Sequence, residues 1–178
     1  MEGAYLIKYG HLPYNGAVSN NGAYSWTGFS EQEVASCNVL SFDCNGGFIE
    51  SGFVYVAQQG GIMSEQSYPY TSALFDQAVN NGQGTTYACS PPSGGAIVDP
   101  ATALQRNVPY TAVQPNSVTA LMSALNVQPV SITLEADQPV FSFYTGGVIT
   151  DVSCGTGANN DHAVLAVGYG TMDGIDYW

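Results

Sequence analysis

The chain has 178 residues, 45% of them hydrophobic, and its two basic residues against fourteen acidic ones leave a formal net charge of −12. A chain of this length and composition can bury a core, which excludes a disordered protein. The negative charge repels nucleic-acid phosphates and anionic membrane surfaces, and no apolar run approaches the about 18 residues of a membrane span, so neither nucleic acid nor membrane is expected as a partner.

The start of the chain predicts the end of a helix followed by a loop. In residues 1–9, apolar and aromatic side chains recur every four positions, and Gly10 suits a C-terminal cap. No N-cap precedes this segment, so we expect the helix to begin upstream. Residues 11–28 are rich in Gly, Asn, Ser and Tyr without a period, which predicts a loop.

A second helix has a clear start signal. Ser30 and Glu33 form a capping box, in which each side chain is expected to accept from the other residue's backbone N–H. Phe29 and Val34 flank the box as a hydrophobic staple. A third helix is predicted over residues 48–59, which Gly60 and Gly61 would end.

The second half of the chain changes from helical to strand periodicity. Residues 82–95 predict a loop, and a short helix starts at Asn116 or Ser117 and is bounded by Pro129. Alternation from Val130 then predicts a half-buried strand. Further strands are predicted at residues 147–149, 163–169 and 175–178. Helices first and strands later predict an α+β fold with two unlike lobes, residues 1–109 and 110–178.

The four cysteines stand at positions 37, 44, 89 and 154. Zinc sites usually bring cysteines in pairs separated by two to four residues, a spacing that this chain does not have. An even number of cysteines in a loop-rich chain with few lysines favours disulfides instead. We therefore expect no metal site.

Short motifs follow one another in a fixed order over nearly the whole chain. They are Ser30-Glu31-Gln32-Glu33-Val34 with Cys37, Cys44-Asn45-Gly46-Gly47, Tyr68-Pro69-Tyr70, Gln128-Pro129-Val130-Ser131, Tyr144-Thr145-Gly146-Gly147-Val148, Asp161-His162-Ala163-Val164 and Val167-Gly168-Tyr169-Gly170. Any one motif is weak evidence. Jointly they resemble the papain and cathepsin L family of cysteine peptidases, although segments 11–28 and 71–88 are longer than the family's usual links.

The resemblance implies a fold and an activity. The fold would be papain-like and α+β, with a helical left lobe, an antiparallel β-barrel-like right lobe and an active-site cleft between them. The activity would be thiol-dependent hydrolysis of peptide bonds, without a cofactor, in which His162 is the catalytic histidine. The family's nucleophilic cysteine would precede Met1 and its orienting asparagine would follow Trp178, so this chain is expected to be an inactive central fragment by itself.

The same resemblance implies the cysteine pairing and the substrate contacts. Cys37 would pair with Cys89, whereas Cys44 and Cys154 would pair with cysteines outside this chain. Gly47 would offer its main chain to an extended peptide, because a glycine leaves room for close backbone approach. The residues implied in substrate binding, including the walls of the S2 pocket, are Asn45, Gly46, Gly47, Phe48, Ile49, Thr133, Asn160, Asp161 and Ala163.

The chemistry explains why a histidine is needed. A free cysteine is mostly thiol at neutral pH, and a helix N-terminus with a neighbouring imidazolium stabilises the thiolate that attacks the amide. The histidine then returns a proton to the leaving amine and later acts as a base on water. His162 could instead be a satisfied structural histidine, but its surrounding motif favours catalysis, whereas His11 has no matching motif.

Partners and alternatives follow from the resemblance. We expect peptide or protein substrates, an inhibitory propeptide in the full-length precursor, and a secreted, lysosomal or vacuolar location. One alternative is a non-catalytic papain-like homologue that acts as a structural or binding module. Another is an unrelated Tyr- and Gly-rich extracellular structural protein, which the order of the motifs disfavours.

Overall fold

A computed structural model describes most of the chain. The described residues are 1–10, 14–18, 24–26, 28–42, 46–70, 89, 97–98, 110–150 and 159–178, with only the backbone for 14–18, 24–26 and 97–98. Their contacts divide the chain into two compact units, Met1–Thr111 and Ala112–Trp178.

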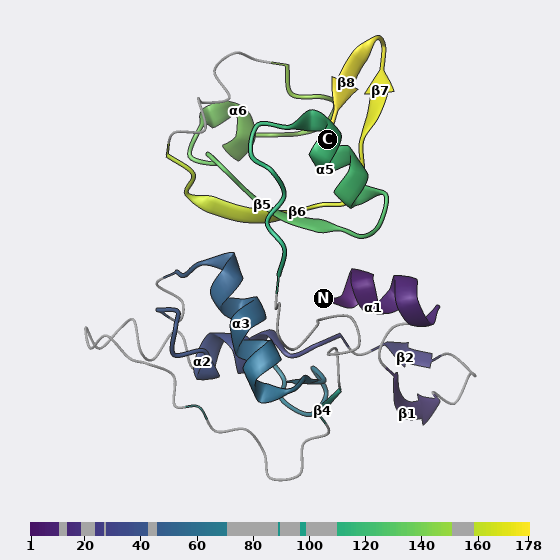
Figure 1. Cartoon of the computed structure of the whole chain (residues 1–178), viewed down its shortest axis with the longest axis vertical. Coiled ribbons are helices and arrows are strands. Elements are labelled where there is room, and N and C mark those ends of the chain that lie inside the picture. Colours follow the sequence, from purple (N-terminus) through teal and green to yellow (C-terminus); the bar gives the residue numbers. More distant parts are fainter. Residues whose placement is uncertain are drawn as a thin grey trace. The chain divides into compact units, whose positions relative to one another are not determined.

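The first unit contains helices and two short strand pairs (Figure 1). Its elements are α1 Glu2–Tyr9, β1 Tyr14–Val18, β2 Tyr24–Trp26, α2 Glu31–Cys37, α3 Ile49–Gln59, β3 Ile62–Met63 and β4 Ile97–Val98. Strands β1 and β2 are antiparallel, as are β3 and β4. The prediction that residues 11–28 form only a loop is therefore wrong, because the β-favouring Tyr and Trp residues in this Gly- and Asn-rich segment pair as a hairpin.

The helix ends agree with the sequence signals. Helix α1 ends at Gly10, whose φ of 74° is left-handed and whose N–H donates to Leu6 O at 2.8 Å. Helix α3 ends at Gly60 in the same conformation, with φ 75°. Because a glycine adopts this conformation without a Cβ clash, both predicted stops are confirmed.

The capping box of α2 forms only in part. Ser30 Oγ accepts from Glu33 N at 2.9 Å, as predicted. However, Ser30 N donates to Met63 O at 2.9 Å, so it has no need of the Glu33 carboxylate. That carboxylate turns to β3 and α3 instead, where it accepts from Met63 N at 2.5 Å and from the Tyr55 hydroxyl at 3.2 Å. Burial and the neighbouring Glu33 raise the pKa of Tyr55.

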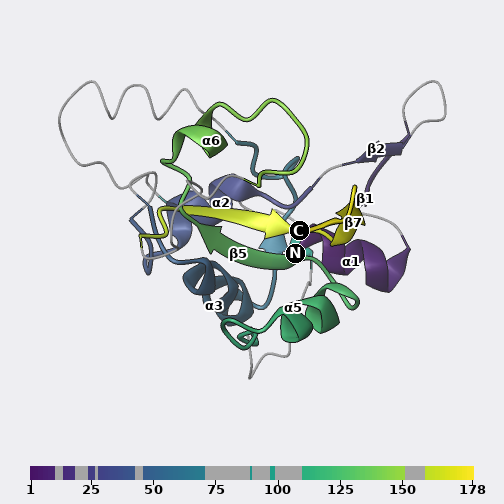
Figure 2. The same ribbon diagram turned by 90° about the horizontal axis from the view of Figure 1, so that it is seen from above.

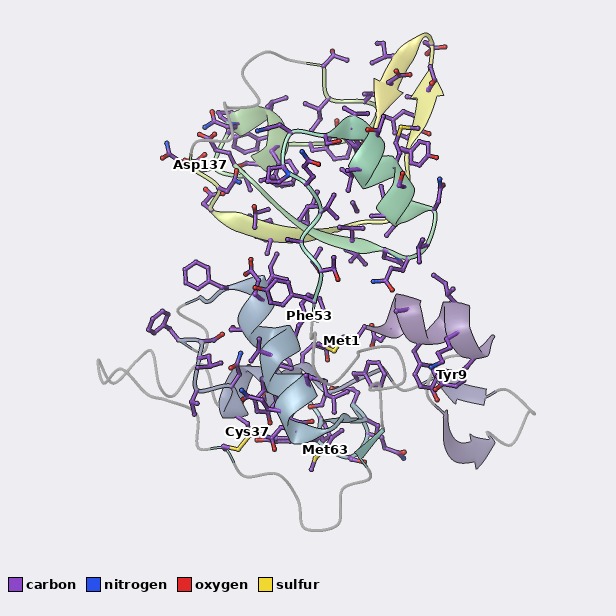
Figure 3. All side chains as sticks on the ribbon, viewed as in Figure 1. Met1, Tyr9, Cys37, Phe53, Met63 and Asp137 are labelled. Atoms are coloured by element: carbon purple, nitrogen blue, oxygen red, sulfur yellow. A yellow bond between two sulfur atoms is a disulfide. The ribbon has the colours of Figure 1, made fainter. Side chains whose placement is uncertain are left out.

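The core of the first unit lies between α1, α2, α3 and β3. Its buried members are Phe29, Cys37, Tyr55, Val56 and Ile62, and Met1, Tyr5, Val34 and Tyr68 pack against them. The Tyr5 and Phe29 rings meet edge to face with centroids 5.8 Å apart. Figure 3 labels Cys37 of this core, together with Met63 of β3. A disulfide joins Cys37 to Cys89, the pair that the resemblance implied.

Among its described residues, the second unit has two antiparallel strand pairs and two helices. Its elements are α5 Val118–Leu125, β5 Val130–Leu134, α6 Pro139–Ser142, β6 His162–Ala166, β7 Gly170–Met172 and β8 Ile175–Tyr177. Strand β5 pairs with β6, and Figure 2 shows the two side by side. Strand β7 pairs with β8. The predicted helix after Ser117 is confirmed, and Ser117 Oγ caps it by accepting from Ala120 N.

Two local predictions in this unit need correction, and one strand was missed. Residues 147–149 form no strand, because Gly146 and Gly147 have positive φ values of 152° and 84°, which strands do not use. The strand predicted at 163–169 is β6, which begins one residue earlier and ends at Ala166. Strand β7 was not predicted, although Asp173-Gly174 between β7 and β8 is a strong hairpin signal and both residues have positive φ.

No helix in the part of the chain that the structure describes is long and apolar enough to cross a lipid bilayer. Among the same residues, no group of three or more His, Cys, Asp or Glu side chains is arranged to hold a metal ion.

Candidate active site

The β5–β6 pair brings together the predicted site residues of the second unit. In its register Leu134 lies opposite His162 and Thr133 lies opposite Ala163. Cross-strand partners share a face of a sheet and successive residues alternate, so Thr133 and Ala163 share one face while His162 lies on the other with Leu134. Two side chains that are 30 positions apart in the sequence are therefore neighbours in the proposed S2 wall.

The residues before β6 are held by hydrogen bonds to β5 and to the segment after it. Asn160 Nδ2 donates to Thr133 Oγ1 at 3.0 Å, so a third member of the proposed S2 wall joins Thr133 and Ala163. Asp161 N donates to Leu134 O at 3.1 Å, and Asp161 Oδ1 accepts from Ala136 N at 2.7 Å. These two hydrogen bonds, one from the backbone and one to the side chain of Asp161, orient the backbone that leads into His162.

His162 is the first residue of β6, and its side chain is exposed. A structural histidine satisfied by burial in a core would lie in a closed environment, which this one does not. The imidazole is therefore open to exchange a proton with a reacting group. The pairing of β6 with β5 fixes the position of the His162 backbone, from which this side chain projects.

The predicted site residues of the first unit lie before and at the start of α3. Gly46, Gly47 and Phe48 are exposed, with 73% of the Phe48 side chain open to solvent, and Ile49 is half-buried. Gly46 has a φ of 110° and its carbonyl accepts from Phe42 N at 2.8 Å. A Cβ on Gly47 would lie 2.5 Å from Ser41 Oγ, so only glycine fits there.

A cluster of polar side chains under Gly47 was not predicted from the sequence. Asn38, which is 4% exposed, donates from Nδ2 to Ser41 Oγ at 3.0 Å and to Ser51 Oγ at 3.1 Å. The two serine hydroxyls are 2.6 Å apart, and Ser51 Oγ donates to Phe48 O at 2.7 Å. Asn38 and Ser41 follow α2 and Ser51 lies in α3, so no local sequence signal links the three, and only the folded chain shows that they meet.

Three acidic residues lie near the start of α2. Glu31 is exposed, yet partial desolvation raises the pKa of its carboxyl, and the carboxylates of Glu65 and Glu2 raise it further. Glu2 Oε1 also accepts from Phe29 N at 2.9 Å, which attaches α1 to the segment before α2. These carboxyls contribute to the fold and lie outside the proposed peptide-binding segment, residues 46–48.

Some predictions lie outside the described residues. Asn45 and Cys44 precede Gly46, and Cys154 and His11 are also among the residues that the structure does not describe. Their predicted roles stay predictions. The predicted site residues that are described fall in both units, Gly46 to Ile49 in the first and Thr133 with Asn160 to Ala163 in the second.

Comparison with known protein families identifies the family of this chain. The family model described as papain family cysteine protease matches residues 15–178. This chain belongs to the papain family. Every motif quoted above for the resemblance lies within the matched residues.

Plant relatives support this membership. A germination-specific cysteine protease of Arabidopsis thaliana is 36% identical over 150 residues, which cover 84% of this chain and 34% of the relative. Vignain of Vigna mungo is 38% identical over 153 residues, which cover 84% of this chain and 36% of vignain. The chain therefore spans about a third of the length of these relatives.

Solved structures show the same fold. The proform of the ragweed pollen cysteine protease Amb a 11 matches with a TM-score of 0.73 and 28% identity, over 99% of this chain and 43% of that one. The Carica candamarcensis cysteine protease CMS1MS2, solved in complex with E-64, matches with a TM-score of 0.65 and 30% identity, over 95% of this chain and 62% of that one. The α+β papain-like fold expected from the sequence is confirmed.

Proposed function

We propose that this chain forms part of a cysteine peptidase that hydrolyses peptide bonds, and that it supplies the catalytic histidine, His162. The observation that carries this proposal is the exposed imidazole at the start of β6, within an Asp-His-Ala-Val motif of a papain-family chain. A lone exposed histidine would mean little. Its place on the β5–β6 pair, opposite Leu134 and directly after the hydrogen-bonded Asp161, gives it a defined position.

In the proposed reaction His162 handles the proton. Its imidazolium stabilises the attacking thiolate, then donates a proton to the leaving amine, and the neutral ring takes a proton from water in deacylation. The resemblance assigns all four cysteines of this chain to structural positions and the orienting asparagine to a position after Trp178, so we propose that residues outside this chain supply the thiolate and this asparagine. None of the four is proposed as the nucleophile.

The substrate is proposed to be an extended peptide. Gly47 would pair with the peptide main chain, and its exposure supports that role. The resemblance assigns Phe48, Ile49, Thr133, Asn160 and Ala163 to the S2 pocket. Because Asn160 and Thr133 are polar and hydrogen-bonded to each other in the second unit, whereas Phe48 of the first unit is apolar and exposed, we propose a mixed P2 preference.

We also propose the partners that the resemblance implies. The structure of Amb a 11 is that of a proform. A propeptide that inhibits the full-length precursor is therefore proposed here too, together with peptide or protein substrates. A secreted, lysosomal or vacuolar location accords with the disulfide between Cys37 and Cys89, because such bonds persist in oxidising compartments.

The test uses the full-length protein that carries this chain, with a fluorogenic dipeptide amide as substrate. We expect cleavage that a thiol alkylator blocks, and a loss of kcat/KM of about 10²- to 10⁴-fold in His162→Ala. His11→Ala is the matched control, since the chain has two histidines, and it should keep the wild-type rate. Cleavage by His162→Ala at the wild-type rate would refute the role of His162.

The 178-residue polypeptide provides a second test. Without a nucleophile, it should not cleave the dipeptide amide at all. Cleavage by this polypeptide that an alkylator blocks would show that one of the cysteines 37, 44, 89 or 154 acts as the nucleophile. A full-length protein that binds peptide without cleaving it would instead support the non-catalytic alternative.

A further inference from the structure

The hydrogen-bond directions within the cluster of Asn38, Ser41 and Ser51 can be assigned completely. Leu40 N donates to Asn38 Oδ1 at 3.1 Å, so the amide nitrogen of Asn38 must face the two serines. Its two hydrogens go to Ser41 Oγ and Ser51 Oγ. Ser51 has one hydroxyl hydrogen, which it gives to Phe48 O at 2.7 Å. Ser41 is therefore the donor in the 2.6 Å contact between the serines.

With these directions, Ser51 at the centre of the cluster makes every hydrogen bond that its hydroxyl can make. Ser51 Oγ makes one donated and two accepted hydrogen bonds, which is the full complement of a hydroxyl. Both Asn38 and Ser51 are buried, with exposed fractions of 4% and 8%. A saturated and buried polar cluster of this kind tolerates one arrangement, because any rotation would leave a buried donor unpaired.

The cluster connects the two sides of the proposed peptide-binding segment. Asn38 and Ser41 follow α2, whereas Ser51 lies in the first turn of α3 and holds the carbonyl of Phe48, the residue after Gly47. Ser41 also lies directly beneath Gly47, at the place where a Cβ would be. On the preceding side, Phe42 N donates to Gly46 O at 2.8 Å.

We propose that Asn38, Ser41 and Ser51 act together as positioning residues, which hold the main chain of Gly46, Gly47 and Phe48 in the conformation that receives a peptide substrate. They touch no substrate themselves. The inference rests on the proposed function, because it assigns a cause to the peptide-binding geometry of that site. Exposed glycines would otherwise sample many conformations, so a fixed backbone lowers the entropic cost of binding.

The first test measures positioning without catalysis. Ser51→Ala removes the hydroxyl at the centre of the cluster, and amide hydrogen exchange at Phe42 reports whether the two sides of the segment stay joined. We expect exchange at Phe42 to accelerate about 5- to 30-fold in Ser51→Ala, as for a lost buried hydrogen bond. Ser36→Ala is the matched control, because it removes a serine hydroxyl bonded to Gln32 within α2 and should leave Phe42 unchanged.

The second test measures peptide binding in the full-length protein. Main-chain hydrogen bonds made equally in the ground and transition states affect KM, so Ser51→Ala should raise KM for a dipeptide amide about 5- to 30-fold with kcat unchanged. Asn38→Asp, which has the same shape but no donors, should do the same. Because the two residues share one cluster, their double variant should raise KM by less than the product of the single effects.

The outcomes separate the inference from the proposed function. Faster exchange at Phe42 together with a raised KM supports the inference. Unchanged exchange at Phe42 overturns it, and so does faster exchange with an unchanged KM, which would make the cluster a support of the fold alone. A wild-type protein that cleaves no peptide overturns the proposed function and the binding part of this inference, whereas the exchange result still decides whether the cluster holds the segment.

Discussion

The two units hold their proposed site residues by different means. In the first unit the segment from Gly46 to Phe48 rests on the polar cluster beneath it, in which Asn38 and Ser51 are buried. In the second, Ala166 is the only buried residue among those described between 112 and 178, and the backbone ladder of β5 and β6 positions His162 and its neighbours. Backbone pairing depends little on side-chain identity, so the same kind of substitution should act very differently in the two units.

The largest expected difference concerns aromatic side chains. Phe29 is 4% exposed and belongs to the core of the first unit, whereas Phe143 in the second unit is 81% exposed. Phe29→Ala should lower the free energy of unfolding by about 3–5 kcal/mol, because it leaves a cavity in a packed core. Phe143→Ala should change it by less than about 0.5 kcal/mol. Chemical denaturation of both variants measures this contrast, and equal losses would contradict it.

The disulfide should have the next largest effect. It links Cys37, which is buried at the end of α2, to Cys89, which is exposed, and 52 positions separate the two residues. Cys89→Ser removes the cross-link without placing a hydroxyl in the core, so the unfolding free energy should fall by about 2–4 kcal/mol. The wild-type chain with its disulfide reduced should match the variant in thermal denaturation. A melting temperature that neither change moves would mean that the first unit does not depend on this bond.

The smallest expected effect is the pH dependence from Glu31. Its pKa is raised in the folded chain, mainly by desolvation, so the folded state binds its proton more tightly than the unfolded state does. The stability from this group is thus fully present below its unfolded pKa of about 4.5 and is lost as the pH rises through the raised value.

Glu31→Gln cannot lose a proton, so it should remove this pH dependence. Compared with wild type, we expect the melting temperature of Glu31→Gln to be higher by about 1–2 °C at pH 7 and equal at pH 4. Thermal denaturation across this pH range is the measurement. A variant that is less stable than wild type at pH 7 would show that attraction between the Glu31 carboxylate and the start of α2 outweighs its desolvation.

Local sequence signals predicted much of the fold. The stops at Gly10 and Gly60, the serine caps of α2 and α5, and strand β5 follow from residues within a few positions of one another. The hairpin of β1 and β2 was missed because short strands lack a period, and the one between β7 and β8 was missed although its Asp-Gly turn was present. Residues 147–149 were mistaken for a strand because two glycines precede an apolar pair.

The sequence by itself determined the family, the helix ends and strand β5, since motifs, caps and periodicity are local properties of the chain. The tertiary structure alone decided which polar groups meet. The Glu33 carboxylate accepts from Met63 N, 30 positions away, instead of from its expected partner Ser30 N. Asn38 donates to Ser51, which is 13 positions away. The physical reason is that a buried donor or acceptor must find a partner, and only packing determines which one lies within reach.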